Sequence, residues 1–421
     1  MRVRTWSRLR DLDEFERVLA SRDVRAGFQP ILDLESNEIV GFEALARLPD
    51  HSSYSDVPAL FAEAYRRGRV GELDWICRGA VFEAVLEDKV PREVPIFLNV
   101  EPAAMNAPCP ADIIGPFAAA TTRCRFIVEV TERELADDPA ELLIALDRAR
   151  QASMGVALDD VGAEPTSLAL MSLIRPDIIK LDVSLIQSRP SMRVASVVNA
   201  VRAESERTGA LILAEGVESE QHRQVALSMG ATLGQGWLFG AADALPDHIP
   251  TPQRPVQFAN QEPALPDSPF TIAARRRPPI PMSRGMLIAI SHQLENEVPT
   301  TSKAVLVSSF QDTRNFGPAT RARYERLTAH TVLTAVLGKG MPDQPGEGIR
   351  GGDLHLSDPL CRQWTVAFLG PNVAGLLSAR QLERTDVDGA PMFEAVVSHD
   401  RATVVDVARS LLLRVPGVAR P

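Results

Sequence analysis

Residues 125–130 read RFIVEV, residues 155–159 read GVALD and residues 177–182 read DIIKLD. Each is a short run rich in Val, Ile and Leu, a composition typical of buried β-strands. A segment with the spacing of a helix, Pro139–Arg150, lies between the first two runs. Strands that alternate with helices along a chain indicate an α/β fold built on a parallel sheet.

The same alternation extends outward from these runs, from Phe28 to Phe239. The other strand candidates are FQPILDL (28–34), EIVGFEALARL (38–48), PIFLNV (95–100), LILAEG (211–216) and LGQGWLFG (233–240). The other helical segments are Pro58–Val70, Glu72–Leu86 and Met192–Glu206. About eight strands interleaved with helices predict a TIM-like (β/α)8 barrel of parallel strands.

The texture of the sequence changes near Ala242. The segment Leu245–Pro281 is rich in proline and ends in the basic run ARRRPP, which favours an extended linker. Strand-like and helical runs then resume up to Leu413, which predicts a second, smaller α/β domain but not its topology. We therefore divide the chain into a barrel domain (1–246), a linker (247–281) and a second domain (282–421).

Composition restricts the class of protein. The 421 residues carry a formal net charge of −10, which argues against a polymeric nucleic acid as partner. The four cysteines form no C-x-x-C pair, so we expect free thiols in a reducing compartment. No apolar signal-peptide core and no run of ~18 apolar residues is present. These features predict a cytoplasmic protein with no membrane partner.

Polar side chains that suit catalysis follow or end nearly every strand candidate of the barrel. They are Glu43, Asn99, Glu129, Asp159 with Asp160, Lys180, Glu215 and Gln235. Any one of them alone is best interpreted as a solvated turn residue, but the C-terminal ends of barrel strands converge on one mouth. Carboxylates and an amide without His or Cys favour Mg²⁺ or Mn²⁺. Adjacent aspartates suit two metal ions, which clamp an in-line phosphoryl displacement.

Eight motifs in this region resemble, in order and approximate spacing, the EAL family of phosphodiesterases, over roughly Arg8–Pro246. They are FQPI (28–31), EALAR (43–47), LNV (98–100), VEVTE (128–132), DDVG (159–162), IKLD (179–182), AEGVE (214–218) and QG (235–236). The resemblance implies hydrolysis of one phosphodiester bond of cyclic di-GMP, which gives linear pGpG, with two Mg²⁺ or Mn²⁺ ions as cofactors. It also implies a homodimer.

The resemblance assigns a role to each residue. Glu43, Asn99, Glu129 and Asp159 would hold one metal, and Asp159 with Asp160 the second. Lys180, Glu215 and Glu218 would be catalytic: Lys180 would position the attacking water, and the two glutamates would organise the waters around the metals. Gln29, Arg47 and Gln235 would bind the substrate, with the guanidinium of Arg47 suited to a phosphate.

One loop departs from the family pattern. Glu164 and Pro165 stand where the family has a glycine and a tyrosine, in a loop that couples the metal site to a dimer interface in the family. An active hydrolase is the leading hypothesis. A cyclic di-GMP receptor that does not cleave its ligand, and an interaction scaffold in which neither domain's site works, remain as alternatives.

The second domain resembles the DICT domain, a sensory module, over roughly Pro269–Leu413. The resemblance is carried by FQ (310–311), GKGMP (338–342), DPL (358–360) and LGP (369–371), together with scattered residues such as Tyr324 and Trp364. It implies an unidentified small ligand or protein as partner. We interpret Gly338-x-Gly340 as a plain turn and Asp400 as the N-cap of a helix.

Overall fold

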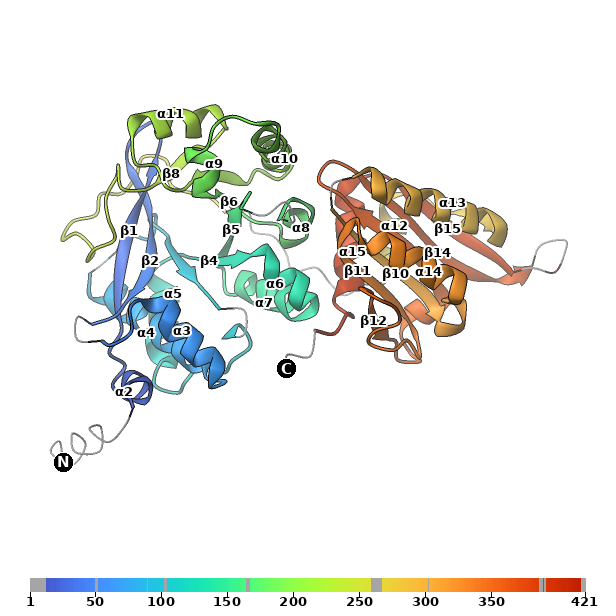
Figure 1. The fold of residues 1–421 in the computed structure, drawn as a ribbon, viewed down its shortest axis with the longest axis horizontal. Coiled ribbons are helices and arrows are strands. Elements are labelled where there is room, and N and C mark those ends of the chain that lie inside the picture. The colour runs from blue at the N-terminus through green and yellow to red at the C-terminus, as the bar shows by residue number, and fades with distance from the viewer. Residues whose placement is uncertain are drawn as a thin grey trace.

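The structure is a computed structural model of the full chain. It describes residues 13–49, 52–88, 90–101, 104–163, 167–258, 267–301, 303–385, 389 and 391–417. Figure 1 shows a barrel unit, coloured blue to yellow-green, beside a second unit built on one large sheet, coloured orange to red. The predicted fold class, a barrel followed by a smaller α/β domain, is confirmed.

Eight strands close into the barrel in the order β1 to β8. They are β1 Arg25–Asp33, β2 Ile39–Arg47, β3 Ile96–Asn99, β4 Phe126–Thr131, β5 Gly155–Val161, β6 Ile178–Leu181, β7 Leu211–Ala214 and β8 Leu233–Gln235. All eight strand predictions overlap an observed strand.

The prediction that all the barrel strands are parallel is wrong for β1. This strand pairs antiparallel with β2 and also with β8. Only five residues, 34–38, connect β1 to β2, and a parallel crossover needs a dozen or more. The turn is stabilised by Asp33, whose Oδ1 accepts hydrogen bonds from the backbone N–H groups of Glu35 and Ser36, and by the left-handed backbone of Asn37 (φ 59°).

Helices surround the barrel. They are α2 Glu14–Ser21, α3 Val57–Arg66, α4 Val70–Glu87, α5 Ile114–Arg123, α6 Glu132–Asp137, α7 Pro139–Gln151, α8 Ser167–Ile174, α9 Val183–Gln187, α10 Met192–Thr208 and α11 Glu220–Ser228. Side-chain N-caps such as Asp56, Asp138 and Ser191 define the start of α3, α7 and α10, because each accepts an N–H bond that the helix leaves open.

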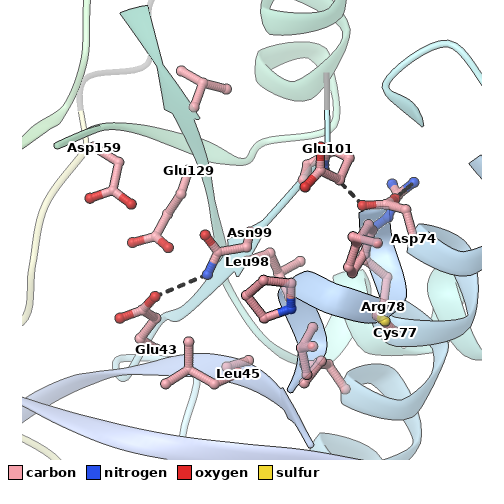
Figure 2. A pocket seen from close by; sticks show the side chains of 18 of the residues that line it. Glu43, Leu45, Asp74, Cys77, Arg78, Leu98, Asn99, Glu101, Glu129 and Asp159 are labelled. Atoms are coloured by element: carbon pink, nitrogen blue, oxygen red, sulfur yellow. Dashed lines mark hydrogen bonds and ion pairs between the residues drawn. The ribbon is translucent and has the colours of Figure 1, made fainter. Parts of the chain in front are cut away.

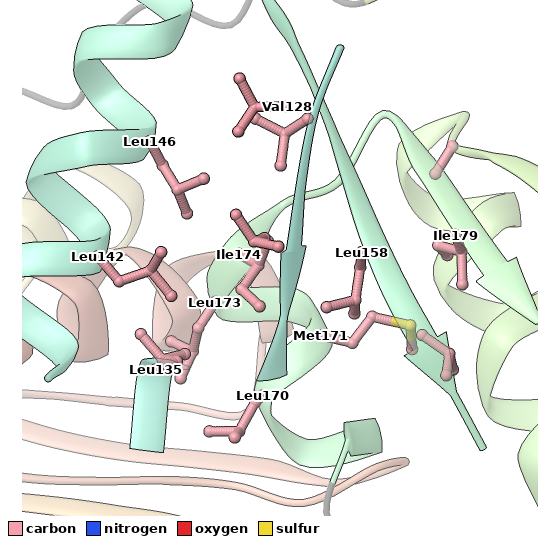
Figure 3. Close-up of a cluster of buried hydrophobic side chains, with 14 of the residues drawn as sticks. Val128, Leu135, Leu142, Leu146, Leu158, Leu170, Met171, Leu173, Ile174 and Ile179 are labelled. Atoms are coloured by element: carbon pink, nitrogen blue, oxygen red, sulfur yellow. The ribbon is translucent and has the colours of Figure 1, made fainter. Parts of the chain in front are cut away.

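The apolar core of the barrel unit lies between the strands and these helices. Figure 3 shows Leu142 and Leu146 of α7 and Met171 and Ile174 of α8 directed toward the strands that carry Val128 and Leu158. These leucines and Ile174 are almost fully buried. The helix α8, which follows the Asp159-Asp160 pair in the chain, is therefore packed firmly against the barrel wall.

The second unit is a seven-stranded mixed sheet with the order β12-β11-β10-β13-β14-β15-β9. Its strands are β9 Ile280–Ser283, β10 Ala304–Asp312, β11 Thr331–Lys339, β12 Arg350–Asp353, β13 Gln363–Leu369, β14 Ala374–Thr385 and β15 Pro391–Ser398. Its helices are α12 Pro269–Arg276, α13 Arg284–Glu297, α14 Pro318–Thr328 and α15 Arg401–Leu412, with 3-10 turns η2 Val298–Thr300, η3 Thr313–Asn315 and η4 Pro359–Arg362.

Two layers of helices cover this sheet. Alternate residues of β10 belong to two different apolar clusters, Leu306 with α13 and α14, and Val305 with α15, because successive side chains of a strand point to opposite faces. The predicted N-cap at Asp400 is confirmed: its Oδ2 accepts from the Thr403 N–H at 2.9 Å and begins α15.

The predicted extended linker does not hold throughout its length. Val256 is buried in the cluster that fills the barrel interior, and its carbonyl accepts a hydrogen bond from Arg125 at 2.8 Å. Pro269–Arg276 forms α12, and β9 pairs with β15. In the sequence, β9 is indicated only by the apolar residues Ile280 and Met282, which lie among prolines. No helix among the described residues is long and apolar enough to cross a membrane.

Candidate metal centre at the barrel mouth

A buried lysine lies at the centre of the acidic side chains. The Lys180 ammonium is 2.7 Å from Glu129 Oε1, 2.9 Å from Glu215 Oε1 and 3.0 Å from Asp159 Oδ1. The Glu43 carboxylate lies 3.8 Å away. Residues that are separated by up to 172 positions in the sequence, from 43 to 215, are thus brought into one cluster, as the barrel prediction required.

The strand period explains why these side chains share one interior. Residues i and i+2 of a strand face the same side. Apolar residues that fill the barrel interior lie two positions before the site residues of β3 to β8: Phe97, Ile127, Ala157, Ile178, Leu213 and Leu233 precede Asn99, Glu129, Asp159, Lys180, Glu215 and Gln235. The polar side chains therefore form the layer directly above an apolar floor.

Two amides bind the carboxylate of Glu43, and a third amide supports one of them. Asn99 Nδ2 donates to its Oε1 at 2.9 Å, and Gln235 Nε2 donates to its Oε2 at 2.5 Å. Gln29, which pairs with Glu43 in the β1–β2 register, accepts a second hydrogen bond from Gln235 at 2.9 Å. Figure 2 shows Asn99 pointing toward Glu43, with Glu129 and Asp159 beside them. Gln29 therefore supports the site from β1.

Burial and mutual charge shift the pKa values of the cluster in opposite directions. Burial raises the pKa of Glu43, but Lys180, Gln235 and Asn99 outweigh it and hold the pKa below its usual value. Burial, together with the charge of Glu43, raises the pKa of Glu129 well above its usual value. Burial raises the pKa of Glu215 to about 8. Burial lowers the pKa of Lys180, but the surrounding carboxylates outweigh it and raise that pKa.

Three carboxylates are placed to hold a cation. Ligand atoms of Asp159, Asp160 and Glu215 lie within 4.8 Å of one another. Asp160 has a left-handed backbone (φ 57°), and its N–H donates to Asp159 Oδ1 at 3.0 Å, so the two adjacent aspartates are turned toward the same mouth. Glu215, predicted as a catalytic residue, therefore also lies where a metal ligand is needed.

The donor set fits divalent metal ions. Within the described part of the chain, the buried Glu129 Oε2 and Gln235 Oε1 have no hydrogen-bond donor, and such oxygens are costly unless something pairs with them. Carboxylate and amide oxygens are the ligands that Mg²⁺ and Mn²⁺ prefer. A cation at the mouth would satisfy both oxygens and the excess of negative charge.

The other predicted site residues lie around this cluster. Arg47 is exposed and lines the same cavity, and its Nη1 donates to the Ala46 carbonyl at 3.0 Å. Glu218 is exposed, and its backbone N–H donates to His222 Nδ1 at 3.3 Å. The altered loop positions Glu164 and Pro165 lie outside the described residues, so the loop prediction stays open.

A second group of polar residues, which the sequence analysis missed, lines the far side of the cavity. Asp74 and Arg78 form a buried ion pair on α4, and Asp74 Oδ1 accepts the Glu101 N–H at 2.9 Å. The Tyr65 hydroxyl donates to Glu101 Oε2 at 2.7 Å. The available signal was an acid and a base four residues apart on one helix. The cavity, about 840 Å³ in volume, extends from the acidic cluster to these residues.

Comparison with known proteins places this site in a family. The EAL domain model matches residues 12–242, more than half of the chain. The chain therefore belongs to the EAL family. The model for a sensory domain in diguanylate cyclases and two-component systems, DICT, matches residues 270–382. Both resemblances inferred from the motifs are confirmed.

Curated relatives match the barrel unit. The uncharacterized protein y4lL of Sinorhizobium fredii is 32% identical over 53% of this chain and 27% of its own length. The probable cyclic di-GMP phosphodiesterase PdeB of Escherichia coli is 27% identical, over 53% of this chain and 43% of its length. The cyclic di-GMP phosphodiesterase RocR of Pseudomonas aeruginosa is 26% identical, over 53% and 58%. The matched region thus spans less than two thirds of each relative.

Among solved structures, BlrP1 of Klebsiella pneumoniae in complex with manganese and cyclic di-GMP is 26% identical, with a TM-score of 0.46. The match covers 52% of this chain and 56% of that one.

Proposed function

We propose that the barrel hydrolyses cyclic di-GMP to linear pGpG with two bound Mg²⁺ or Mn²⁺ ions. The observation that carries the proposal is the convergence of Glu43, Glu129, Asp159 and Glu215 around the buried Lys180. Relatives described as cyclic di-GMP phosphodiesterases support the choice of substrate.

The side chains of the site would have different roles in the reaction. Glu43, Asn99, Glu129 and Asp159 would hold one metal, and Asp159, Asp160 and Glu215 the other. When bound, two divalent ions supply an activated water and neutralise charge on the phosphate. Lys180 fixes the positions of three carboxylates and adds a positive charge where negative charge develops. Gln235 and Gln29 hold Glu43 in place, and Glu218 would order water at the rim.

The cavity provides room for the rest of the substrate. Its volume of about 840 Å³ is in the range of small-molecule sites. Arg47 lines the wall on the β2 side, where it would contact a phosphate as a fixed-charge donor. Asp74 and Tyr65 line another part of the wall, so polar protein groups would face the substrate away from the metal centre as well.

The test is incubation of the full chain with cyclic di-GMP and Mg²⁺ or Mn²⁺, followed by chromatographic detection of pGpG. Metal-dependent pGpG supports the hydrolase. Saturable binding of cyclic di-GMP without product in either metal would instead support the receptor, and no binding would support the scaffold. Homodimerisation stays a prediction that sedimentation can check.

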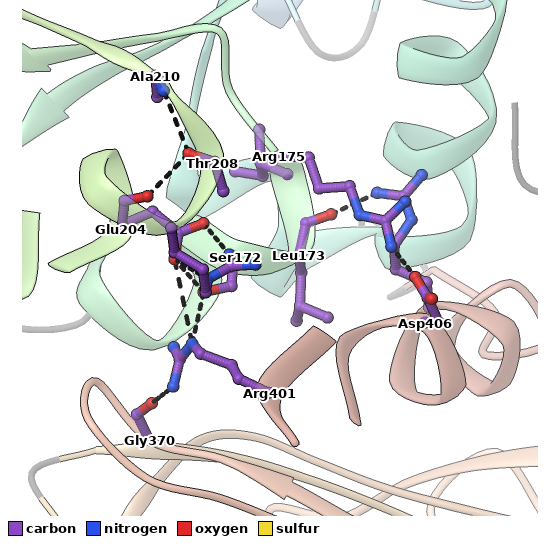
Figure 4. A network of polar contacts seen from close by, with 12 residues as sticks. Ser172, Leu173, Arg175, Glu204, Thr208, Ala210, Gly370, Arg401 and Asp406 are labelled. Carbon is purple, nitrogen blue, oxygen red and sulfur yellow. Dashed lines mark hydrogen bonds and ion pairs between the residues drawn. The ribbon is translucent and has the colours of Figure 1, made fainter. Parts of the chain in front are cut away.

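We further propose that the second domain regulates the barrel through α15. Arg409 of α15 is buried, donates to the Leu173 carbonyl of α8 and lies 3.0 Å from Asp147 of α7. Arg401 of α15 donates to Ser172 Oγ of α8 at 3.0 Å. Figure 4 shows Arg401 directed across the boundary between the units toward Ser172.

Two elements connect this interface to the metal centre. The helix α8, which begins at Ser167, is the next helix after the Asp159-Asp160 pair in the chain. The helix α10 contacts both places: Arg193 at its start donates to the carbonyls of Gly162 and Ala163 at 2.8 Å, and Glu204 accepts from Ser172 at 2.9 Å. A shift of α15 would therefore act on the metal loop. Because Val256 packs into the apolar interior of the barrel, the barrel domain extends at least to this residue. We therefore place the domain boundary near residue 267, before α12.

A further inference from the structure

A second cavity, about 610 Å³ in volume, lies in the sensory domain on the face of the sheet opposite α15. It is bordered by α13, by the start of α14 and by the ends of β10, β13 and β15. Figure 1 shows α13 and α14 on this domain, away from the barrel mouth. The volume falls within the range of small-molecule binding sites.

One face of α13 lines this cavity. Arg284, Ile288, Ser291 and Glu295 all border it, and their spacing of four, three and four residues places them on a single helical stripe. Ser291 is 3% exposed, and its Oγ has no hydrogen-bond partner among the described residues. A serine within a helix ordinarily bonds to a carbonyl of the preceding turn, so this hydroxyl lacks the partner that burial normally requires.

The opposite wall carries a second unsatisfied polar atom. Trp364 of β13 borders the cavity, and its buried Nε1 has no acceptor in the described part of the chain. Its ring packs edge-on against Phe393 of β15, with centroids 6.4 Å apart. Buried indole N–H groups usually have a partner. The Ser291 hydroxyl and the Trp364 indole N–H thus face the cavity from two elements, and a polar atom of a bound molecule could bond to both.

The charge at this cavity is positive. Three arginines border it: Arg323 is paired with Glu295 at 2.5 Å, Arg314 is paired with Asp312 at 2.9 Å, and Arg284 supplies the net charge. Arg284 is exposed and forms no ion pair with any described residue. The helix α14 also begins here at Gly317 without a side-chain cap. Its first N–H groups therefore stay open, and such a helix start favours an anion.

We propose that this cavity binds a small organic anion with a planar ring system. The acid group would lie between Arg284 and the first turn of α14, and the ring would stack against Trp364 and Phe393. A polar atom on the ring would bond to Ser291 Oγ and Trp364 Nε1. The site and α15 occupy opposite faces of the same sheet, because α13 and α15 pack on alternate residues of β13.

The test uses two probes that share one hydroxylated ring and differ in charge, 6-hydroxy-2-naphthoate and 6-hydroxy-2-naphthamide (naphthoate and naphthamide below), titrated calorimetrically into the full chain. We expect saturable binding of naphthoate at least about tenfold tighter than that of naphthamide, since a hydrogen bond to a charged group is stronger than one to a neutral group. Arg284→Gln should remove most of this preference. Ile288→Trp, which fills the cavity without changing charge, should abolish the binding of both probes.

The matched control is Arg326→Gln, which removes another exposed arginine, from α14 outside the cavity, and should leave both affinities unchanged. Circular dichroism checks that each variant is folded. Equal affinities for the two probes, no saturable binding of naphthoate, or a naphthoate affinity that Ile288→Trp leaves intact would overturn the proposal. Binding is measured without cyclic di-GMP, so the result is independent of catalysis.

Discussion

The Lys180 ammonium lies 2.7 Å from the Glu129 carboxylate, and both side chains are almost fully buried within the barrel. Removing a charge from water is unfavourable, so buried charges are found where an opposite charge pairs with them. Without metal, this ammonium is the positive charge nearest to Glu129, Asp159 and Glu215 among the described ion pairs. The cluster therefore depends on Lys180 when metal is absent, and shares that dependence with the cations when they are bound.

Lys180→Met should therefore destabilise the protein strongly in a chelator. Removal of one partner from a buried ion pair costs about 3–5 kcal/mol. In EDTA, Lys180→Met should unfold at a clearly lower Tm than the wild type. Excess Mg²⁺ should then raise the Tm of Lys180→Met by more than it raises the Tm of the wild type. Lys339→Met, at an exposed lysine of the second domain, is the control. Identical Tm values for Lys180→Met and the wild type in EDTA would show that the cluster is not held by this charge.

The pH dependence of metal binding follows from Glu215. Its pKa of about 8 in the folded protein lies above its ordinary value of 4.5, so between these values the folded state holds a proton that the unfolded state has lost. The free energy of unfolding without metal therefore falls as pH rises through this window. A metal ligand must be deprotonated, so Mg²⁺ should raise Tm more at about pH 8 than at about pH 6.

Differential scanning fluorimetry with and without excess Mg²⁺ at the two pH values measures this difference. Glu215→Gln, which does not titrate, should reduce it. A Tm gain that is larger at the lower pH would contradict the assignment of Glu215 to the metal centre.

Gly162 is expected to be required in the loop after the aspartate pair. It has a left-handed backbone (φ 99°), and an added Cβ would lie 2.4 Å from Leu185 Cδ1. Gly209 also has a left-handed backbone (φ 79°) but has open space around it. Gly162→Ala should therefore weaken Mg²⁺ binding and turnover and lower Tm by more than Gly209→Ala, where only the backbone strain acts. Equal effects of the two changes on Mg²⁺ affinity would show that this loop does not position the metal ligands.

The contact between Arg409 and Asp147 should couple the two units energetically. Arg409 is 4% exposed, and this burial lowers its pKa to about 9. A double-mutant cycle with Arg409→Met and Asp147→Asn, read as free energy of unfolding, should give a coupling of about 1–3 kcal/mol. The exposed pair Arg254–Glu35 should give no measurable coupling. Additive effects at Arg409 and Asp147 would remove the support for regulation through α15.

The strand positions were predictable because their residues carry the pattern locally. The apolar runs that end in Asn99, Glu129 and Lys180 are short, dense in branched residues and followed by turns, and period 2 places each polar residue above an apolar one. The direction of β1 was missed because strand direction is decided by the connection. The five residues between β1 and β2 are too few for a parallel crossover, so the sequence did indicate an antiparallel pair. The prediction of a barrel of eight parallel strands did not take this short connection into account.

Contacts between distant segments could not be predicted. The pairing of β9 with β15, the packing of Val256 into the barrel floor and the salt bridge from Arg409 to Asp147 each join residues more than 100 positions apart. No local period encodes them. The role of Asp74 was hidden for a related reason: an acid and a base on α4 are typical of a solvated face, and burial of the pair depends on where β3 ends.

The rate of pGpG formation by Glu43→Gln tests the central claim most directly. This change keeps the size of the side chain and one of the two oxygens that accept from Asn99 and Gln235, but removes the negative charge that a metal ion needs. Purified wild type, Glu43→Gln and the exposed control Glu35→Gln are incubated with cyclic di-GMP and Mg²⁺ or Mn²⁺ under single-turnover conditions. The account predicts metal-dependent pGpG formation by the wild type and by Glu35→Gln, and a rate at least about 100-fold lower for Glu43→Gln, since the ions supply both the nucleophile and charge stabilisation. An unchanged rate in Glu43→Gln, or no pGpG from the wild type in either metal, would contradict it.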